Sequence, residues 1–220
     1  MLHQTFPAKL DFDVSATDGA ESWWGDIGDD WLRINMITDA AGNFVDYKAS
    51  SDGLTGGVDR TLLKSLRKMA DAVIIGASTV RAEPASIPRD KQLIIVSLSG
   101  EMLGQVLSKT EFVPIVFSTE QLSLPGFVFH KIDDFSAESL ISGAKAIGFK
   151  KLVCEGGPTL ARLFEKAVSP VEWCQTISPS QGKPSSEKLE TPSWPLIAEA
   201  RDDAGFVYSR RSRFGAPATA

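Results

Sequence analysis

Runs of apolar and polar residues alternate along this chain in a way that predicts an α/β fold. Residues 31–37, 71–76 and 151–155 are short, apolar and β-compatible, as expected for central strands. Residues 59–70 instead place apolar side chains at helical spacing, with basic residues between them. A strand, a helix and a second strand at this spacing indicate a right-handed crossover between parallel strands. We therefore expect a mostly parallel central sheet flanked by helices.

The middle of the chain extends this sheet. Three more strands are predicted, at residues 92–97, 112–118 and 127–129. Pro114 cannot donate a ladder hydrogen bond, so it either places its strand at the sheet edge or shifts the start of the strand. Ser136 is a favoured N-cap and predicts a helix over residues 137–147.

The end of the chain has a different pattern. Residues 171–177 alternate between apolar and polar side chains, as in a half-buried antiparallel strand. Residues 178–195 are rich in Ser, Pro, Gly and Lys and predict a long loop, and residues 205–210 predict a last strand. We expect antiparallel strands near the C-terminus and a disordered tail at residues 215–220.

Composition is that of an ordinary globular protein. Of the 220 residues, 43% are apolar and 23% are charged, and no repeat or linker interrupts them. We expect a single domain over residues 1–220, in which residues 1–30 are an N-terminal extension. Trp23 and Trp24 in this extension are expected to pack against the core rather than stack on a ligand. The net charge of −5 gives no chain-wide attraction for nucleic acid or anionic lipid, so we expect neither partner.

The few cysteines and histidines give no indication of disulfides or of a metal site. Cys154 and Cys174 lie in apolar runs and predict buried thiols in a reducing compartment. His3 and His130 have no partner at metal-ligand spacing, so we expect no metal site. No apolar run approaches the length of about 20 residues that a membrane helix needs. The first residues lack the pattern of a secretion signal, and we expect a cytoplasmic protein.

A glycine pair after the strand at 151–155 is the first candidate for chemistry. Gly156 and Gly157 allow the backbone to approach a ligand closely, and Pro158 suits the first position of a helix. Free amides and the positive end of the helix dipole then favour an anion such as a nucleotide phosphate. The alternative interpretation is a tight strand-to-helix turn that binds nothing.

A second loop, residues 76–84, follows the strand at 71–76. Ser78 and Thr79 at a strand tip can bind a phosphate or a ribose, and Arg81 can bind a phosphate bidentately. The alternative is an N-capped helical turn with Arg81 in solvent. The loop does not match G-x-G-x-x-G, so the Rossmann fingerprint is absent.

Three carboxylates follow the same strands. If the three strands are neighbours, their loops share one edge and form one cleft, where open α/β sheets bind ligands. There Asp39, Glu83 and Glu155 can bind amino or ring N–H groups, or relay a proton. For Asp39 and Glu83 the alternative is a solvated loop acid. Glu155 ends an apolar strand beside the glycine pair, which favours a functional role.

Four stretches together resemble a known family. Residues 32–36, 59–60, 70–83 and 155–160 are similar to the reductase domain of riboflavin biosynthesis, which has the dihydrofolate-reductase-like fold. The resemblance covers roughly residues 31–178. It implies an enzyme that reduces the ribosyl group of an aminopyrimidine ribose phosphate to ribityl with NADPH. It also implies a homodimer.

The resemblance implies roles for individual residues. We expect cofactor contacts from a set at the tips of three strands: Thr38, Gly76, Ser78, Thr79, Val80, Arg81, Gly156, Gly157, Pro158, Thr159 and Leu160. We expect Asn35, Glu83 and Arg89 to contact the substrate. Glu155 and Asp39 are the expected catalytic residues.

The loop after the first strand departs from the family pattern. The family usually has a Ser, an apolar residue, Asp-Gly and often Lys; here Asp39 takes the Ser position, Ala41 replaces the acid and Asn43 replaces the Lys. A carboxylate at position 39 would repel a substrate phosphate and could change which pyrimidine fits. A reductase of a pterin or another pyrimidine, and a non-catalytic nucleotide-binding paralogue, therefore stay open as alternatives.

Overall fold

The chain forms two compact units. The computed structural model describes residues 1–15, 18–84, 86–98, 110–121 and 125–214. The first unit comprises Met1–Met69 and Pro170–Ala220, and the second comprises Ala70–Ser169. The single domain expected from the sequence stays a prediction, and the tail predicted at 215–220 lies outside the described residues.

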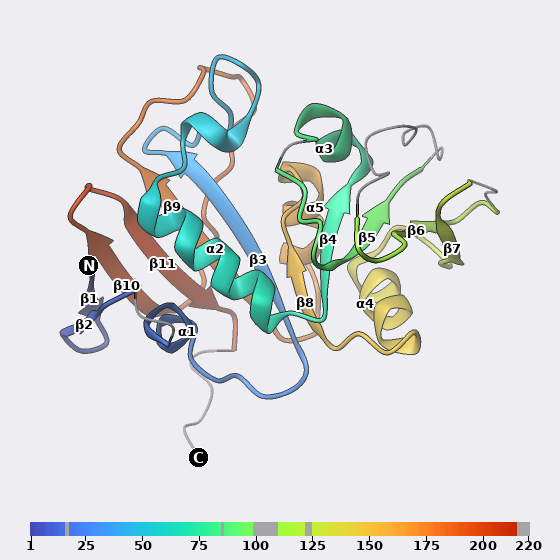
Figure 1. The fold of residues 1–220 in the computed structure, drawn as a ribbon, viewed down its shortest axis with the longest axis horizontal. Helices are drawn as coiled ribbons and strands as arrows, with labels where there is room; N and C mark the ends of the chain where they lie inside the picture. Colours follow the sequence, from blue (N-terminus) through green and yellow to red (C-terminus); the bar gives the residue numbers. More distant parts are fainter. Residues whose placement is uncertain (16–17, 85, 99–109, 122–124, 215–220) are drawn as a thin grey trace. The chain divides into compact units, whose positions relative to one another are not determined.

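The first unit is a mixed sheet with two helices. Its strands are β1 (Leu2–Phe6), β2 (Leu10–Phe12), β3 (Trp31–Asp39), β9 (Val171–Ser178), β10 (Leu196–Asp202) and β11 (Val207–Ser212). They lie in the order β2-β1-β10-β11-β9-β3, and only β3 and β9 pair in parallel. The helices are α1 (Gly19–Trp24) and α2 (Gly57–Met69), with a 3₁₀ turn η1 (Ser51–Gly53) before α2. Figure 1 shows α2 running across one face of this sheet.

Strand β9 corrects one prediction. The alternating segment at 171–177 is a strand, but it is not half-buried, and only its pairing with β11 is antiparallel; it also runs parallel to β3. All its residues except Ile177 are buried. The polar positions that suggested a wet face include Glu172, whose carboxylate is buried between Arg33 of β3 and Arg210 of β11.

These three residues form a buried charged triad. Arg33 Nε lies 3.3 Å from Glu172 Oε2, and Arg210 pairs with the same carboxylate. Trp31 covers the Arg33 guanidinium, with 5.0 Å between the guanidinium carbon and the ring centroid. Trp24 lies over it as well, at 5.5 Å. Both tryptophans of the predicted extension, Trp23 and Trp24, are buried, which confirms that they pack in the core.

The sequence missed several elements of the first unit. Strands β1, β2 and β10 and helix α1 were not predicted; β10 pairs with β1 on one side and with the predicted strand β11 on the other. The predicted long loop at 178–195 contains no helix or strand, and β10 begins directly after it. The last predicted strand, 205–210, is β11, displaced by two residues.

The second unit is an all-parallel sheet with helices. Its strands are β4 (Ala72–Gly76), β5 (Gln92–Val96), β6 (Ile115–Ser118), β7 (Val128–Lys131) and β8 (Lys151–Cys154), in the order β8-β4-β5-β6-β7. Its helices are α3 (Ala77–Ala82), α4 (Ala137–Ala146) and α5 (Pro158–Glu165). Pro114 shifts the start of β6 to Ile115 and does not put it at the edge. Ser136 caps α4 as predicted, accepting a hydrogen bond from Ser139 N–H at 3.2 Å.

The core of the second unit follows from β-branched side chains on β4 and β5. One face buries Val73, Ile75, Leu93 and Ile95 together with Val80 of α3. Cys154 on β8 is a buried free thiol, as is Cys174 in the first unit, which confirms the predicted burial of both. Burial raises the pKa of the Cys154 thiol to about 12, which favours the protonated thiol near neutral pH. Within the described residues, no helix is long and apolar enough to cross a membrane.

Candidate functional site

Two of the predicted loops meet in the second unit. β4 and β8 are parallel neighbours, with Ile74 opposite Cys154. The Glu155 N–H donates to the Ile74 carbonyl at 3.0 Å and carries the pairing one residue further. Each strand leads into a helix, β4 into α3 and β8 into α5 (Figure 1). Because the strands are parallel, the loop at 76–83 and the loop at 155–160 lie at the same edge of the sheet.

The two glycines of the second loop, Gly156 and Gly157, differ in how much room a side chain would have. A Cβ at Gly156 would lie 2.5 Å from Leu160 Cδ1 and 3.0 Å from Leu160 Cβ, so the close packing of α5 on its own loop needs glycine there. A Cβ at Gly157 would meet only Thr79 Oγ1, at 3.8 Å. Gly157 is the N-cap of α5, Pro158 is its first residue, and no side chain caps the helix. A small side chain at position 157 therefore has room beside the positive end of the α5 dipole.

Thr79 joins the two loops. Its Oγ1 accepts a hydrogen bond from the Gly157 N–H at 3.2 Å, which fixes the glycine pair against α3. Ser78 and Arg81 are exposed on α3, and Thr159 is exposed on α5, so these side chains can reach a ligand. Val80 is fully buried in the core, so only its backbone is available to a cofactor.

Three charged residues predicted as site residues, Glu155, Glu83 and Arg89, belong to this unit. Glu155 is half-buried between β8 and the glycine pair, and Glu83 is half-buried at the end of α3. The Glu83 N–H donates to the Thr79 carbonyl at 2.8 Å. Arg89 is exposed, seven residues after α3 ends. The substrate and catalytic roles expected for these three residues stay predictions.

In the first unit, Asp39 ends β3 as a buried carboxylate. It is 6% exposed and accepts four hydrogen bonds. They come from the backbone amides of Ala41 (2.9 Å), Asn43 (2.8 Å) and Gly182 (2.9 Å) and from the Asn43 side-chain amide (2.6 Å). Burial alone would raise the pKa of Asp39, but these hydrogen bonds outweigh it and lower the pKa below its usual value. The carboxylate therefore stays ionised, and its lone pairs are engaged within the protein.

Asn43 completes this arrangement. Its side chain is 4% exposed, and its Oδ1 accepts hydrogen bonds from the Ser185 N–H at 3.2 Å and from Lys188 Nζ. Gly42 between the two polar residues has φ +77° and lies against Leu189, whose N–H donates to the Gly42 carbonyl at 3.0 Å. We call Asp39, Asn43, Gly182, Ser185 and Lys188 the loop clamp, because they fasten the loop after β3 to the long loop before β10. The two residues that depart from the family pattern, Asp39 and Asn43, are thus the ones whose side chains accept the hydrogen bonds of the loop clamp.

Asn35 and Thr38 lie on β3 before the clamp. The Thr38 hydroxyl is buried and accepts a hydrogen bond from Gln175 Nε2 at 3.1 Å. Asn35 is half-buried and lines a small cavity of about 10 Å³, close to the size needed for one water. Their expected contacts with cofactor and substrate stay predictions.

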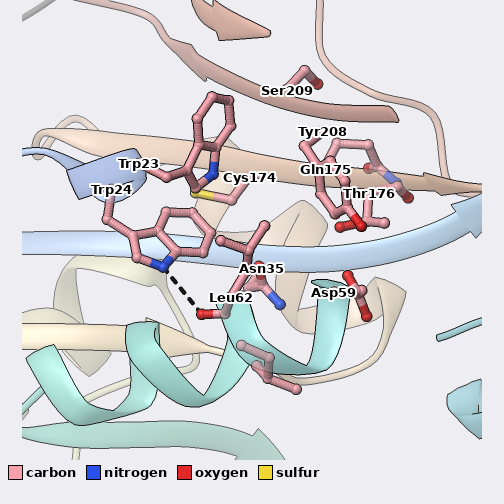
Figure 2. A pocket seen from close by; sticks show the side chains of 11 residues that line it. Trp23, Trp24, Asn35, Asp59, Leu62, Cys174, Gln175, Thr176, Tyr208 and Ser209 are labelled. Carbon is pink, nitrogen blue, oxygen red and sulfur yellow. Dashed lines mark hydrogen bonds between the residues drawn. The ribbon is translucent and has the colours of Figure 1, made fainter. Parts of the chain in front are cut away.

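Figure 2 shows this cavity between β3, β9, β11 and the two helices of the first unit. One wall is apolar and the other is polar. The polar side chains are those of Asn35, Asp59, Gln175, Thr176, Tyr208 and Ser209.

Asp59 was not predicted as a site residue, although its place in the sequence carries a signal. It lies three residues before Leu62 and seven before Leu66, on the buried stripe of α2. An acid on an apolar stripe is rarely buried without a partner or a task. Asp59 also belongs to the stretch 59–60 that resembles the family, but the resemblance implied no role for it.

Comparisons with known proteins agree with this geometry. The RibD C-terminal domain family matches residues 30–172, well over half of the chain. A pyrimidine reductase-like protein from Corynebacterium diphtheriae is 20% identical, with a TM-score of 0.61 over 83% of this chain and 91% of that chain. No curated protein matches in sequence.

Two further solved structures are similar. The deaminase/5-amino-6-(5-phosphoribosylamino)uracil reductase of Thermotoga maritima is 17% identical, with a TM-score of 0.62 over 89% of this chain. The match spans 58% of that protein, a little over half its length. The riboflavin biosynthesis reductase of Saccharomyces cerevisiae is 13% identical, with a TM-score of 0.58 over 88% of this chain and 94% of that chain.

At these identities the likeness to solved structures is one of fold. It confirms the α/β, dihydrofolate-reductase-like fold expected from the sequence. The family match rests on the sequence itself and covers both strand-tip loops of the second unit as well as β3. The chain therefore belongs to the RibD C-terminal domain family.

Proposed function

We propose that this chain is an NADPH-dependent reductase that converts the ribosyl group of an aminopyrimidine ribosyl phosphate to ribityl. The observation that carries the proposal is the pair of loops at one edge of the second unit, joined by the hydrogen bond from Gly157 N–H to Thr79 Oγ1. Family membership and the reductase named for the Thermotoga maritima relative support the same reaction class.

The residues of these loops fit a dinucleotide phosphate. A Cβ at Gly157 would meet only Thr79 Oγ1, at 3.8 Å, and the start of α5 has no side-chain cap. A phosphate placed there would meet backbone amides and the positive end of the helix dipole. Ser78, Thr79 and Arg81 would hold the nucleotide half with hydroxyl and guanidinium groups. When bound, NADPH would supply the hydride that reduces C1′ of the opened sugar imine.

The two expected catalytic acids take different parts in this proposal. Glu155 lies between β8 and the glycine pair, where its carboxylate can orient the reacting group or move a proton. Asp39 has four donors and a lowered pKa, so we assign it to holding the loop clamp rather than to proton transfer. Asn35, Glu83 and Arg89 are the proposed substrate contacts.

Two further features of the function rest on the family. We propose a homodimer, which size-exclusion chromatography with light scattering would detect as twice the mass of 23.8 kDa. We also propose a cytoplasmic location, supported by two buried cysteines that are unpaired.

The direct test is an activity assay with the full chain. Purified protein is incubated with NADPH and 5-amino-6-(5-phosphoribosylamino)uracil while the absorbance of the reduced nicotinamide is followed. Loss of absorbance that depends on both substrates is the expected result. Calorimetry that detects no NADPH binding to folded protein would contradict the proposal.

A second candidate is a reductase of the same fold that acts on a pterin or another pyrimidine. The loop clamp favours it, because Asp39 and Asn43 stand where the family usually has Ser and Lys. A panel of such substrates, assayed with NADPH, separates the two candidates. NADPH binding without turnover on any substrate would instead identify a non-catalytic paralogue.

A further inference from the structure

His3 on β1 lies between two aspartates that come from different parts of the first unit. Its Nδ1 lies 2.8 Å from Asp11 Oδ1 on β2, and its Nε2 lies 3.0 Å from Asp203 Oδ1 in the turn between β10 and β11. β2 is the outermost strand on this side of the sheet, next to β1 (Figure 1). One imidazole ring therefore joins an edge strand, the neighbouring strand and a turn.

The two contacts together require a protonated ring. An ionised carboxylate only accepts hydrogen bonds, and a neutral imidazole carries one N–H. A neutral His3 can therefore donate to Asp11 or to Asp203 but not to both, whereas an imidazolium ring donates to both at once. The hydrogen bonds with these two carboxylates raise the pKa of His3 above its ordinary value of about 6.5.

The other charged groups near His3 act on the ring or on its partners. Asp203 also receives the Met1 ammonium at 3.1 Å, and the hydrogen bonds from His3 and from this ammonium lower the pKa of Asp203. Arg201 of β10 lies opposite His3 in the β1–β10 pair, and its positive charge favours the neutral ring, as desolvation of the ring does. Because the pKa of His3 is raised, the two carboxylates outweigh these effects.

The strand that His3 fastens is short and partly exposed. β2 is three residues long (Leu10–Phe12), and Asp11 is its middle residue. Leu10 is 52% exposed, while Phe12 packs edge-on against the Trp23 ring with 6.2 Å between the ring centroids. Short edge strands with exposed side chains open locally at low free-energy cost. A contact that fastens Asp11 should therefore change how often β2 opens.

We propose that His3 is a pH-sensitive clasp: its protonated ring fastens β2 and the β10–β11 turn to β1, and its neutral ring holds only one of them at a time. The pKa of His3 is higher in the folded chain than in the unfolded chain. The clasp is therefore complete below the unfolded value of about 6.5 and is lost as the pH rises through the folded value. His3 lies outside residues 30–172, which match the family, so this inference goes beyond the proposed function.

The titration of His3 can be followed directly, because the chain has only two histidines, His3 and His130. The imidazole NMR signals of the untagged full chain are recorded from about pH 5 to about pH 9. His3→Gln removes one signal and so assigns both. We expect His3 to titrate at a higher pH than in the urea-unfolded chain. High salt should bring its titration closer to the unfolded value, since exposed ion pairs are screened.

Amide hydrogen exchange measures whether the clasp holds the two segments. Protection factors in β2 and in the β10–β11 turn should fall about two- to fivefold as the pH rises through the titration of His3, the range expected for an exposed ion pair. In His3→Gln the same amides should show no such step. Asp203→Asn removes one carboxylate, so the titration of His3 and the step should both move to lower pH. Asp26→Asn is the matched control and should behave as the wild type does, because the exposed Asp26 carboxylate bonds the Gly28 N–H instead.

Three results would overturn the clasp. One is a titration of His3 in the folded chain at or below the pH of its titration in the unfolded chain. Another is a set of protection factors that stay level while His3 titrates, and the third is a step that persists in His3→Gln. If His3→Gln does not fold, the wild-type titration and Asp11→Asn decide the question, because Asp11→Asn should also move the titration of His3 to lower pH.

Discussion

The loop after β8 and the loop after β3 both follow a strand of buried residues, but they treat their polar groups in opposite ways. After β8, no side chain caps α5, and a Cβ at Gly157 would meet only Thr79 Oγ1, at 3.8 Å. After β3, the Asp39 carboxylate receives four hydrogen bonds and Asn43 receives two from the long loop. The first arrangement uses one amide, Gly157 N–H, to join Thr79 and leaves the start of α5 without a side-chain cap, whereas the second fastens one loop to another through a buried carboxylate. A loop at a strand tip can therefore bind a ligand or, like the loop clamp, hold two parts of the chain together. The partners of its hydrogen bonds distinguish the two cases.

The largest expected effect is on NADPH affinity, when a negative charge is placed in the loop after β8. Gly157→Asp should lower NADPH affinity about a hundredfold or more, because it places a carboxylate beside the expected phosphate. The fold should survive, since a Cβ there meets only Thr79 Oγ1 at 3.8 Å. Calorimetric titration measures the affinity. Gly157→Ala adds the Cβ without the charge and serves as the control; equal affinities of the two variants would show that no phosphate binds there.

Removing Asp39 from the loop clamp should lower the stability of the fold instead. Asp39→Ala leaves the buried amides of Asn43 and Gly182 and the part-buried amide of Ala41 without their acceptor, at a cost of roughly 3 kcal/mol in the free energy of unfolding. Urea denaturation measures this change. NADPH affinity should remain as in the wild type. A variant with full stability and no turnover would instead restore the catalytic role first expected for Asp39.

A smaller effect tests the packing of the loop after β8. Gly156→Ala would bring a Cβ within 2.5 Å of Leu160 Cδ1, and relieving this overlap should cost about 1–2 kcal/mol. The double variant Gly156→Ala/Leu160→Ala removes Leu160 Cδ1, the atom that would lie nearest to the new Cβ. A double-mutant cycle by thermal denaturation should then show favourable coupling between the two changes. Additive losses would mean that the loop moves aside and that the glycine is not required for packing.

The smallest expected effect is a pH dependence of the stability that Asp39 contributes through the loop clamp. The pKa of Asp39 is lowered in the folded state, so its contribution to stability is present above the pKa of the unfolded chain, about 3.9. That contribution disappears as the pH falls through the folded pKa. The stability difference between wild type and Asp39→Ala should therefore shrink as the pH falls from about 4 to lower values. A constant difference over this range would mean that hydrogen bonds to an ionised Asp39 do not stabilise the loop.

The local sequence was enough to predict the loop after β8, but not to predict the loop clamp. Pro158 and the glycine pair define the start of α5 through their own backbone preferences, and the helical spacing in α2 is equally local. The partner of Asp39 at Gly182 is 143 residues away, so nothing near Asp39 indicates that its carboxylate is engaged. β10 was missed for a similar reason. Its Ala, Glu and Leu residues favour helix, and pairing with β1 and β11 overrides that preference.

The buried triad of Arg33, Glu172 and Arg210 has a consequence for how this sequence can diverge. Each member comes from a different strand, and both guanidinium groups share the Glu172 carboxylate as their counter-ion. Loss of Glu172 alone would leave two cations in an apolar interior, at a cost of about 3–5 kcal/mol. Replacing all three by well-packed apolar residues would cost far less. Over evolutionary time these positions should behave as one inherited unit, kept together in some lineages and exchanged together in others.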